Sequence, residues 1–284
     1  MTDLVSIAKA VDYIEESLRQ PITVADMAGN ASYSVYHFCR MFNKVTHHPP
    51  YDYLMRRRLS ESASALLRSD RKIIDIALEH QFNNPETFSR AFKRMFGTQP
   101  SRLRKRGQID RRRLMPRLTM ARLFHIESGM RLPPSLVEHE AIQIAGFQTL
   151  VRDDERAVSD LWELLDQELR SLPDAQQDAS YVGLRYYPER WEEVGSLYVA
   201  GFETGDPDVL GAGAVVKTVP SRECARFVHI GSGDELGLTL DYVYQTWSPR
   251  SGTRLSERWV IERYGLDVGG SRDRSETRIL IPIM

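Results

Sequence analysis

The stretch Thr87-Phe88-Ser89-Arg90-Ala91-Phe92-Lys93-Arg94-Met95-Phe96-Gly97 indicates most clearly how the first part of this chain folds. Phe88 and Phe92 recur at helical spacing, and the charged residues between and after them fall on the opposite face. Asn83-Asn84-Pro85 just before the stretch is a typical helix start, and Gly97 is a typical helix end. These residues predict an amphipathic helix over residues 85–96.

The same pattern occurs a second time, earlier in the chain. Thr23–Pro50 aligns with Lys72–Pro100, at an offset of 49 residues before the turn and 50 after it. Each copy reads as a short helix, a turn and a longer amphipathic helix, which is the helix-turn-helix arrangement whose second helix can enter a major groove. The matched pairs are Asp26 with Asp75, Ala28 with Ala77, Tyr33 with Phe82, Phe38 with Phe88, Arg40 with Arg90, Phe42 with Phe92 and Pro50 with Pro100.

Each second helix is predicted to have one apolar and one polar face. In the first copy we expect Val35, Phe38, Met41 and Phe42 to face inward. Each polar face contains an arginine, which can contact guanine or a phosphate group. An ordinary helical core with a solvated face would explain one such unit, but two copies in one basic segment favour DNA binding.

The first half as a whole is predicted to be all-α. Apolar spacing and capping residues predict helices at about 4–18, 23–29, 34–45, 50–68, 72–80, 85–96 and 100–105. Residues 1–106 contain 17 Lys and Arg against 11 Asp and Glu, a balance of +6, whereas residues 107–284 contain 21 against 28, a balance of −7. A basic half joined to an acidic half is consistent with a polyanionic partner for the first half alone.

Residues 1–105 resemble the DNA-binding domain of the AraC/XylS family of bacterial transcription regulators, over Ser32–Lys44 and Phe82–Arg104. The resemblance implies one chain that places two recognition helices in successive major grooves of double-stranded DNA, with RNA polymerase as a further partner. Cys39, Gln81 and Pro85 depart from the common family pattern, so the base preference cannot be carried over. The expected DNA-binding residues are Ser34, Tyr36, His37, Cys39, Arg40, Asn84, Pro85, Glu86, Arg90 and Lys93.

The second half has a different character. Residues 107–129 are basic and contain Arg111-Arg112-Arg113, which predicts a linker between domains at 1–106 and 130–284. Beyond the linker, alternating apolar runs and two helical patterns predict an α+β domain of two β-α-β-β repeats. Tyr181–Tyr186 aligns with Trp259–Tyr264 at an offset of 78, and such paired units typically leave a groove that can hold a ligand.

Glu262 interrupts one of these apolar strands. Period-2 alternation places it on the same face as Val260 and Tyr264. A carboxylate among aromatic residues is costly to bury unless it is paired, so it either meets a cationic ligand or is exposed or paired with Arg258 or Arg185. The residues alone leave both interpretations open.

Residues 130–284 resemble the GyrI-like effector-binding domain. The motifs are Val182–Pro188, Trp247–Gly252, Glu262-Arg263-Tyr264 and Ile281-Pro282-Ile283. The resemblance implies that a buried glutamate at Glu262 meets an amphipathic or cationic compound, with aromatic residues lining the groove. The expected ligand-binding residues are Glu262, Tyr186, Trp191, Trp247 and Tyr264.

Three functions are compatible with these features. The leading one is a ligand-responsive transcription regulator, with no catalytic residues. The alternative is a hydrolase of reactive small molecules in which Glu262 acts as general base, and a third is an architectural DNA-binding protein. Product formation would indicate the hydrolase, and saturable binding that is lost in Glu262→Gln would argue against the architectural role.

Several classes of protein are not expected. Cys39 and Cys224 are far apart, which argues against a disulfide framework, and no motif for a metal ion or a cofactor is present. No apolar run is long enough to span a membrane, and the first residues do not read as a signal peptide, so we expect a cytoplasmic protein without a membrane partner.

Overall fold

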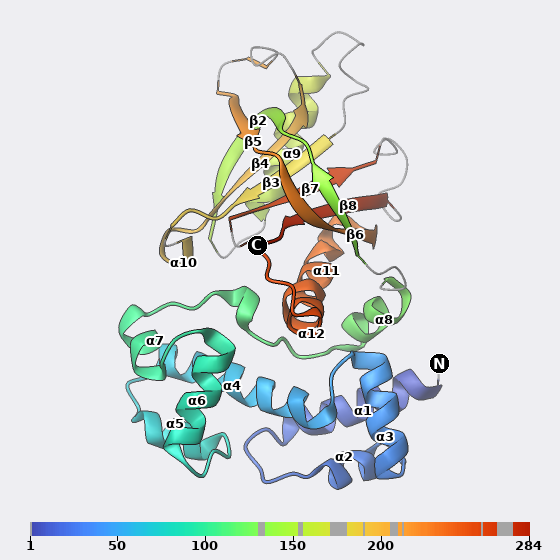
Figure 1. The fold of residues 1–284 in the computed structure, drawn as a ribbon, viewed down its shortest axis with the longest axis vertical. Helices are drawn as coiled ribbons and strands as arrows, with labels where there is room; N and C mark the ends of the chain where they lie inside the picture. Colours follow the sequence, from blue (N-terminus) through green and yellow to red (C-terminus); the bar gives the residue numbers. More distant parts are fainter. Residues whose placement is uncertain are drawn as a thin grey trace. The chain divides into compact units, whose positions relative to one another are not determined.

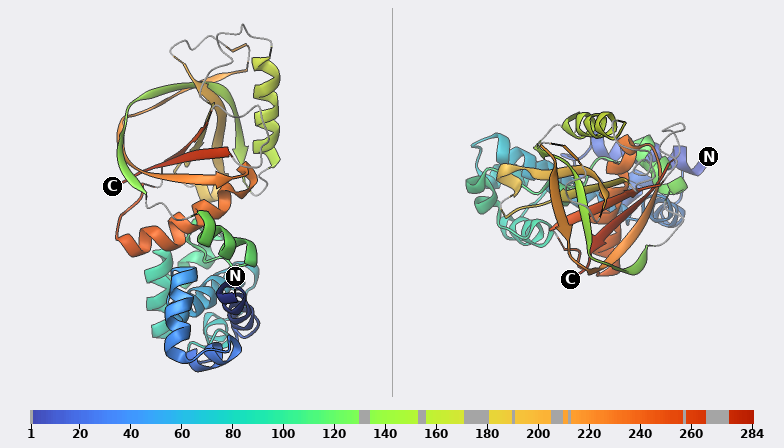
Figure 2. Two further views of the ribbon diagram at one scale, coloured as in Figure 1. Left: turned by 90° about the vertical axis from the view of Figure 1, so that its right-hand side faces the viewer. Right: turned by 90° about the horizontal axis from the view of Figure 1, so that it is seen from above.

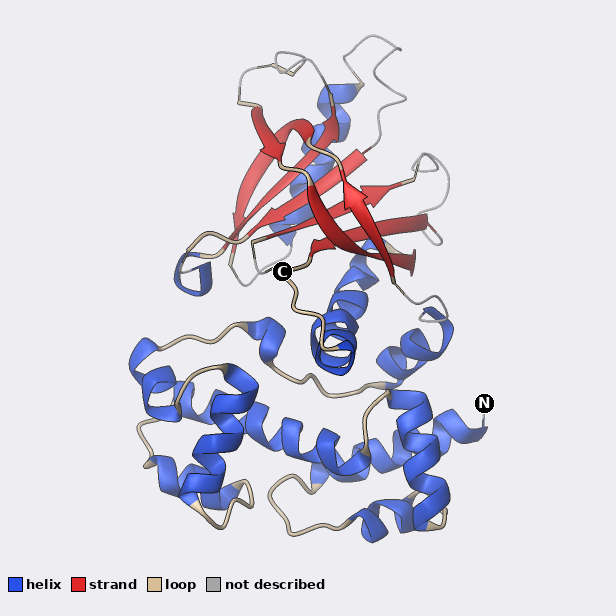
Figure 3. Cartoon of the chain, in the orientation of Figure 1, coloured by secondary structure: helices blue, strands red, loops and turns tan. Residues whose placement is uncertain are grey.

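A computed structural model of the chain describes residues 2–129, 134–152, 156–170, 181–189, 191–204, 210–211, 213–256, 258–265 and 275–284. These residues form two compact units. The first comprises Met1–Met130 and Leu240–Arg250, and the second comprises Arg131–Thr239 and Ser251–Met284. Among the described residues the first unit is helical and the second is built on an antiparallel sheet (Figure 1, Figure 3).

The helices up to residue 106 begin and end within two residues of the predicted bounds. The helices are α1 (Thr2–Glu16), α2 (Val24–Asn30), α3 (Val35–Thr46), α4 (Pro50–Arg68), α5 (Ile73–Glu79), α6 (Pro85–Phe96) and α7 (Pro100–Arg106). At α2, α3 and α6 the side chains of Thr23, Ser34 and Asn84 accept from free backbone N–H groups and fix where each helix begins.

The first unit has two hydrophobic cores, and α4 contributes to both. Tyr53 and Leu54 pack with residues of α1, α2 and α3. Leu59, Ala63 and Leu66 pack with residues of α5, α6 and α7. One continuous helix therefore fixes the spacing between the two halves of this unit.

The residues predicted as a linker, 107–129, contribute to the first of these cores. They contain the 3-10 helix η1 (Arg111–Arg113) and the helix α8 (Met120–Gly129). Met115, Leu118, Leu123 and Ile126 are buried in the core. Because these apolar residues are widely spaced among arginines, they show no helical period that would have predicted an element.

Leu240–Arg250 also belongs to the first unit, although it lies late in the chain. It contains the end of α11 (Leu236–Tyr242), the π-helix η4 (Val243–Trp247) and most of α12 (Ser248–Ser251). The Oγ1 atom of Thr246 lies 2.9 Å from Nε2 of His48, and Gln245 donates to the backbone carbonyl of Arg112. The side chains of Gln245 and Thr246 are buried, so the segment forms part of the packed interior of the first unit.

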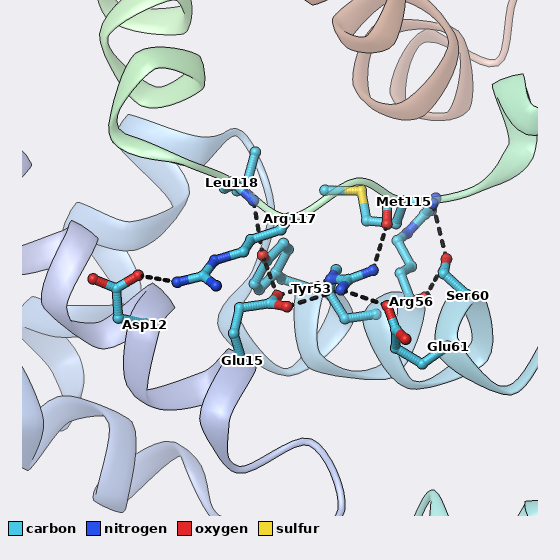
Figure 4. A network of polar contacts seen from close by, with 10 residues as sticks. Asp12, Glu15, Tyr53, Arg56, Ser60, Glu61, Met115, Arg117 and Leu118 are labelled. Atoms are coloured by element: carbon cyan, nitrogen blue, oxygen red, sulfur yellow. Dashed lines mark hydrogen bonds and ion pairs between the residues drawn. The ribbon is translucent and has the colours of Figure 1, made fainter. Parts of the chain in front are cut away.

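A buried polar network joins three parts of the first unit (Figure 4). Arg57 donates to both carboxylate oxygens of Glu15 at 2.8 Å and to the carbonyl oxygen of Met115 at 2.8 Å. Tyr53 donates to Glu15 at 2.7 Å and accepts from the backbone of Leu118 at 3.1 Å. The Arg57 and Glu15 side chains are only 8% and 6% exposed, so the pair ties α1, α4 and the segment after α7 together in a water-poor site.

The second unit contains one eight-stranded antiparallel sheet, in the order β1-β6-β8-β7-β3-β4-β2-β5. The helix α9 (Arg156–Leu169) packs against β2 and β4 on one face (Figure 2). The short strand β1 has no counterpart among the predicted runs. The strands are β1 (Ser135–His139), β2 (Ile142–Val151), β3 (Tyr181–Tyr186), β4 (Ser196–Glu203), β5 (Val215–Val219), β6 (Arg222–Gly231), β7 (Trp259–Tyr264) and β8 (Ser275–Pro282).

The two faces of this sheet carry separate cores. Leu161 and Leu165 of α9 pack on Phe147, Tyr198 and other residues of one face. Val182, Leu184 and Ile261 belong to the core of the opposite face. Alternation along β3 and β7 therefore assigns Gly183 and Glu262 to the α9 face, because Gly183 lies between Val182 and Leu184 and Glu262 directly follows Ile261.

We expect Arg57→Ala to lower the free energy of unfolding by about 3–5 kcal/mol, because it leaves Glu15 buried without its cation. Arg56→Ala is the matched control: Arg56 pairs with Asp52 at 2.7 Å, and its side chain is 26% exposed. That substitution should cost less than about 1 kcal/mol. Urea unfolding followed by circular dichroism measures both, and equal losses would contradict the importance of the buried pair.

Candidate functional site

The helices α3 and α6 have matching ends. Ser34 caps α3 by accepting from the backbone of His37 at 3.4 Å, and Asn84 caps α6 by accepting from Glu86 at 2.7 Å. The first helix ends at His47 and the second at Gly97, both in the left-handed conformation. The turns before the helices match as well, because Ser32 and Gln81 have φ values of 58° and 65°. Gln81 therefore has a backbone conformation that glycine adopts more readily.

The outward faces of the two helices also correspond. Phe38 and Phe42 of α3, like Phe88 and Phe92 of α6, are buried, whereas Arg40 of α3 and Arg90 of α6 are exposed. All ten residues expected to bind DNA are exposed except Cys39, which is half-buried; Tyr36 is 80% exposed. Val35 was expected to face inward but is 46% exposed, because it occupies the first helical position, ahead of the packed turns.

In the second unit, Glu262 lies in a cluster of aromatic residues. Its side chain is 2% exposed. Tyr198 of β4 and Tyr264 of β7 both donate to its Oε2 atom, at 2.6 and 2.9 Å. No ion pair to Glu262 occurs in the part of the chain that the structure describes. The alternatives of an exposed carboxylate or a pair with Arg258 or Arg185 are therefore wrong: Arg258 pairs with Glu189, and Arg185 donates to Ser196.

Gly183 allows this cluster to form. It pairs with Glu262 across β3 and β7. A Cβ atom at this position would lie 2.3 Å from the hydroxyl of Tyr198 and 2.7 Å from Oε2 of Glu262. Any larger residue at position 183 would therefore displace the hydroxyl of Tyr198 and the carboxylate of Glu262, which hydrogen-bond to each other.

Trp162 of α9 covers the cluster. Its Nε1 atom donates to the hydroxyl of Tyr198 at 3.3 Å, and its ring meets that of Tyr264 edge-on, with centroids 5.1 Å apart. On the other side, the guanidinium of Arg185 lies 5.1 Å from the centroid of the Tyr198 ring. Trp162, Tyr198, Gly183 and Arg185 were not predicted, since only strand pairing and helix packing bring them to Glu262.

The other predicted ligand residues lie elsewhere. Tyr186 pairs with Trp259, which belongs to the core of the face opposite Glu262. Tyr186 lies three positions after Gly183, and an odd offset along a strand changes the face. Trp191 begins α10 (Trp191–Val194) and stacks edge-on with Tyr187, with centroids 5.0 Å apart. Trp247 belongs to the first unit. Of the five predicted residues, the structure brings only Glu262 and Tyr264 together.

The chemistry of the cluster favours binding of a cation over proton abstraction. Burial and the nearby charge of Glu262 raise the pKa of both Tyr198 and Tyr264 well above the ordinary tyrosine value. Both phenols therefore stay protonated and donate to the carboxylate. The two hydrogen bonds already occupy the Oε2 atom that a general base would use to take up a proton.

Other types of site are absent from the parts of the chain that can be described. No group of three His, Cys, Asp or Glu side chains there is arranged to hold a metal ion. Cys39 and Cys224 are both free thiols. None of the helices in the described ranges has the length and apolar character needed to cross a membrane.

Comparison with known proteins gives two family matches and several relatives. A model described as a helix-turn-helix domain matches residues 27–106, and one described as a GyrI-like small molecule binding domain matches residues 132–284. The transcriptional regulator Rob of Salmonella typhimurium is 42% identical over 96 residues, which cover 34% of this chain and 33% of Rob. The right origin-binding protein of Escherichia coli is 43% identical over 93 residues, covering 33% and 32% of the two chains.

These two matches span about a third of each relative's length. The regulatory protein SoxS of Escherichia coli is 37% identical over 100 residues, which cover 35% of this chain and 94% of SoxS. The relatives named here are regulators rather than enzymes. Because the GyrI-like match covers more than half of the sequence and the SoxS match covers nearly all of that relative, the chain belongs to the AraC-type helix-turn-helix proteins that carry a GyrI-like small molecule binding domain.

Proposed function

We propose that this chain is a DNA-binding transcription regulator whose second unit binds a small amphipathic cation. The observation that carries the effector part is the state of Glu262. A buried carboxylate is costly unless a cation or several donors compensate it, and here only two phenols do so among the described residues. A ligand cation would complete the compensation, and the neighbouring rings of Trp162 and Tyr264 offer faces and edges suited to an apolar, positively charged molecule.

A cation can reach Glu262 only after a covering side chain moves, because the carboxylate is 2% exposed. Trp162 is half-buried and contacts both tyrosines, so it is the side chain that the ligand displaces or joins. A ligand regulates only if it binds two functional states with different free energies. The position of Trp162 against the two tyrosines and the position to which the ligand displaces it provide such states within the second unit.

The helix pairs α2–α3 and α5–α6 are the proposed helix-turn-helix units, with α3 and α6 as recognition helices. Their matched caps, turns and exposed faces support this assignment. The helix α4 joins the two proposed helix-turn-helix pairs and has 19 residues, which corresponds to about 28 Å of helix. That length suits two helices that read successive major grooves, which are roughly 34 Å apart along DNA.

The sheet order supports the proposal of two repeats. Read from one edge the strands are β1-β6-β8-β7, and read from the other edge they are β5-β2-β4-β3. The strands at matching positions are β1 and β5, β6 and β2, β8 and β4, and β7 and β3, and the members of each pair are four strands apart along the chain. Two copies of a four-strand unit would give this pattern. On the same proposal the protein acts in the cytoplasm with RNA polymerase as its partner, and it needs no cofactor.

We expect Arg40→Ala and Arg90→Ala each to weaken DNA binding by about 1–3 kcal/mol, because each removes one charged donor from a recognition helix. An operator selected from a random duplex library with the unaltered chain provides the ligand for fluorescence anisotropy. Arg170→Ala is the control, since Arg170 is an exposed arginine of the second unit that pairs with Asp166. Unchanged affinity in both helix variants would contradict the assignment of α3 and α6.

We expect Glu262→Gln to weaken binding of tetraphenylphosphonium by at least about tenfold, because the amide keeps the shape of the side chain but removes the charge that faces the cation. Isothermal titration calorimetry measures the affinity, and tryptophan fluorescence follows Trp162. Glu203→Gln is the control, since Glu203 is a more exposed carboxylate of β4 that pairs with Arg263. Equal affinity in all three proteins would remove Glu262 from the effector site.

A further inference from the structure

Thr277 of β8 is a fully buried residue whose hydroxyl group has no hydrogen-bond partner. Its exposed fraction is 0%, and its Oγ1 atom meets no donor or acceptor among the described residues. It pairs with Tyr264 on one side and with His229 of β6 on the other. Paired residues of antiparallel strands point to the same face, so these three side chains form a row on the face that carries Glu262.

The neighbours of Thr277 already use their hydrogen-bonding groups. Nε2 of His229 lies 2.9 Å from the carbonyl oxygen of Ser232, so it must carry the proton, and Nδ1 then accepts from Thr239 at 2.8 Å. Burial lowers the pKa of His229, which keeps this arrangement neutral. The proton of Tyr264 is donated to Glu262. The hydroxyl of Thr277 therefore points into a row in which neither paired neighbour satisfies it.

An unsatisfied buried hydroxyl destabilises a folded protein, and valine would fill the same space without that cost. A buried polar atom without a hydrogen-bond partner needs an explanation, and one explanation is a ligand that forms the hydrogen bond when it binds. From Thr277 and its row we infer that the hydroxyl is a second polar anchor of the effector site, which rests on the proposed function of Glu262. The effector is then a cation that also carries a hydrogen-bonding group, and Thr277 selects for that group.

The register sets the distance between the two anchors. Glu262 pairs with Ile279, so Thr277 is its diagonal neighbour on the next strand. Diagonal neighbours in an antiparallel pair are about 7–8 Å apart. The hydrogen-bonding group of the effector should therefore lie within about this distance of its cationic centre. A hydroxyl, ether or amide attached to the apolar part of the molecule meets this requirement.

The test uses two probes that differ by one polar group: tetraphenylphosphonium and (4-hydroxymethylphenyl)triphenylphosphonium. The unaltered protein should bind the hydroxymethyl probe about five- to tenfold more tightly. Thr277→Val should abolish this preference and leave the affinity for tetraphenylphosphonium unchanged within about twofold. Thr218→Val, at an exposed position of β5, should keep the preference.

A second measurement separates ligand recognition from folding. Without ligand, Thr277→Val should melt at the same temperature as the unaltered protein or higher, because it removes an unsatisfied hydroxyl. Equal affinity for the two probes in the unaltered protein, or equal weakening of both by Thr277→Val, would overturn the inference while the role of Glu262 stands. Failure of both probes to bind the unaltered protein would overturn the proposed effector function and this inference together.

Discussion

A charged carboxylate beneath a β-sheet must be surrounded by donors, and the second unit is arranged to meet that requirement at Glu262. One donor, Tyr264, belongs to β7 like Glu262 itself, and the other, Tyr198, belongs to β4, which lies on the far side of β3. Tyr198 can cross that strand only because the residue between them is Gly183, which has no side chain to block its path. The helix α9 then closes the cluster with Trp162. Strand order, a single glycine and one helix together determine which groups surround the carboxylate.

The helical unit could be predicted closely from sequence because its signals are local. The bounds of α6, Pro85–Phe96, agree with the predicted range, since Asn84, Pro85 and Gly97 define its ends through their own backbone preferences. Apolar spacing also identified the buried face, apart from Val35 at the first position of α3. The segment 107–129 was not identified, because its few buried residues depend on packing against helices that lie far away in sequence.

The proposed effector site around Glu262 was only partly predictable, because strand pairing depends on residues far apart in the chain. Alternation along one strand placed Glu262 and Tyr264 together, and the structure agrees. The offset of 78 matched Leu184 with Glu262, but Leu184 pairs with Ile261 in the opposite core, and Gly183 pairs with Glu262. A shift of one residue exchanges the two faces of a strand. Tyr198 was not predicted, because no local pattern reveals that β4 lies next to β3.

The placement of Leu240–Arg250 has a consequence for how the chain can be divided. The second unit is discontinuous, and the residues that interrupt it supply Thr246 to His48 and Gln245 to the carbonyl of Arg112. A fragment that ends after residue 130 would leave His48, which is 3% exposed, without this partner. SoxS, whose match to this chain covers 94% of its length, represents the DNA-binding part as a separate protein. In the present chain a single cut cannot release that part with all of its packed residues, because some of them are synthesised after most of the second unit.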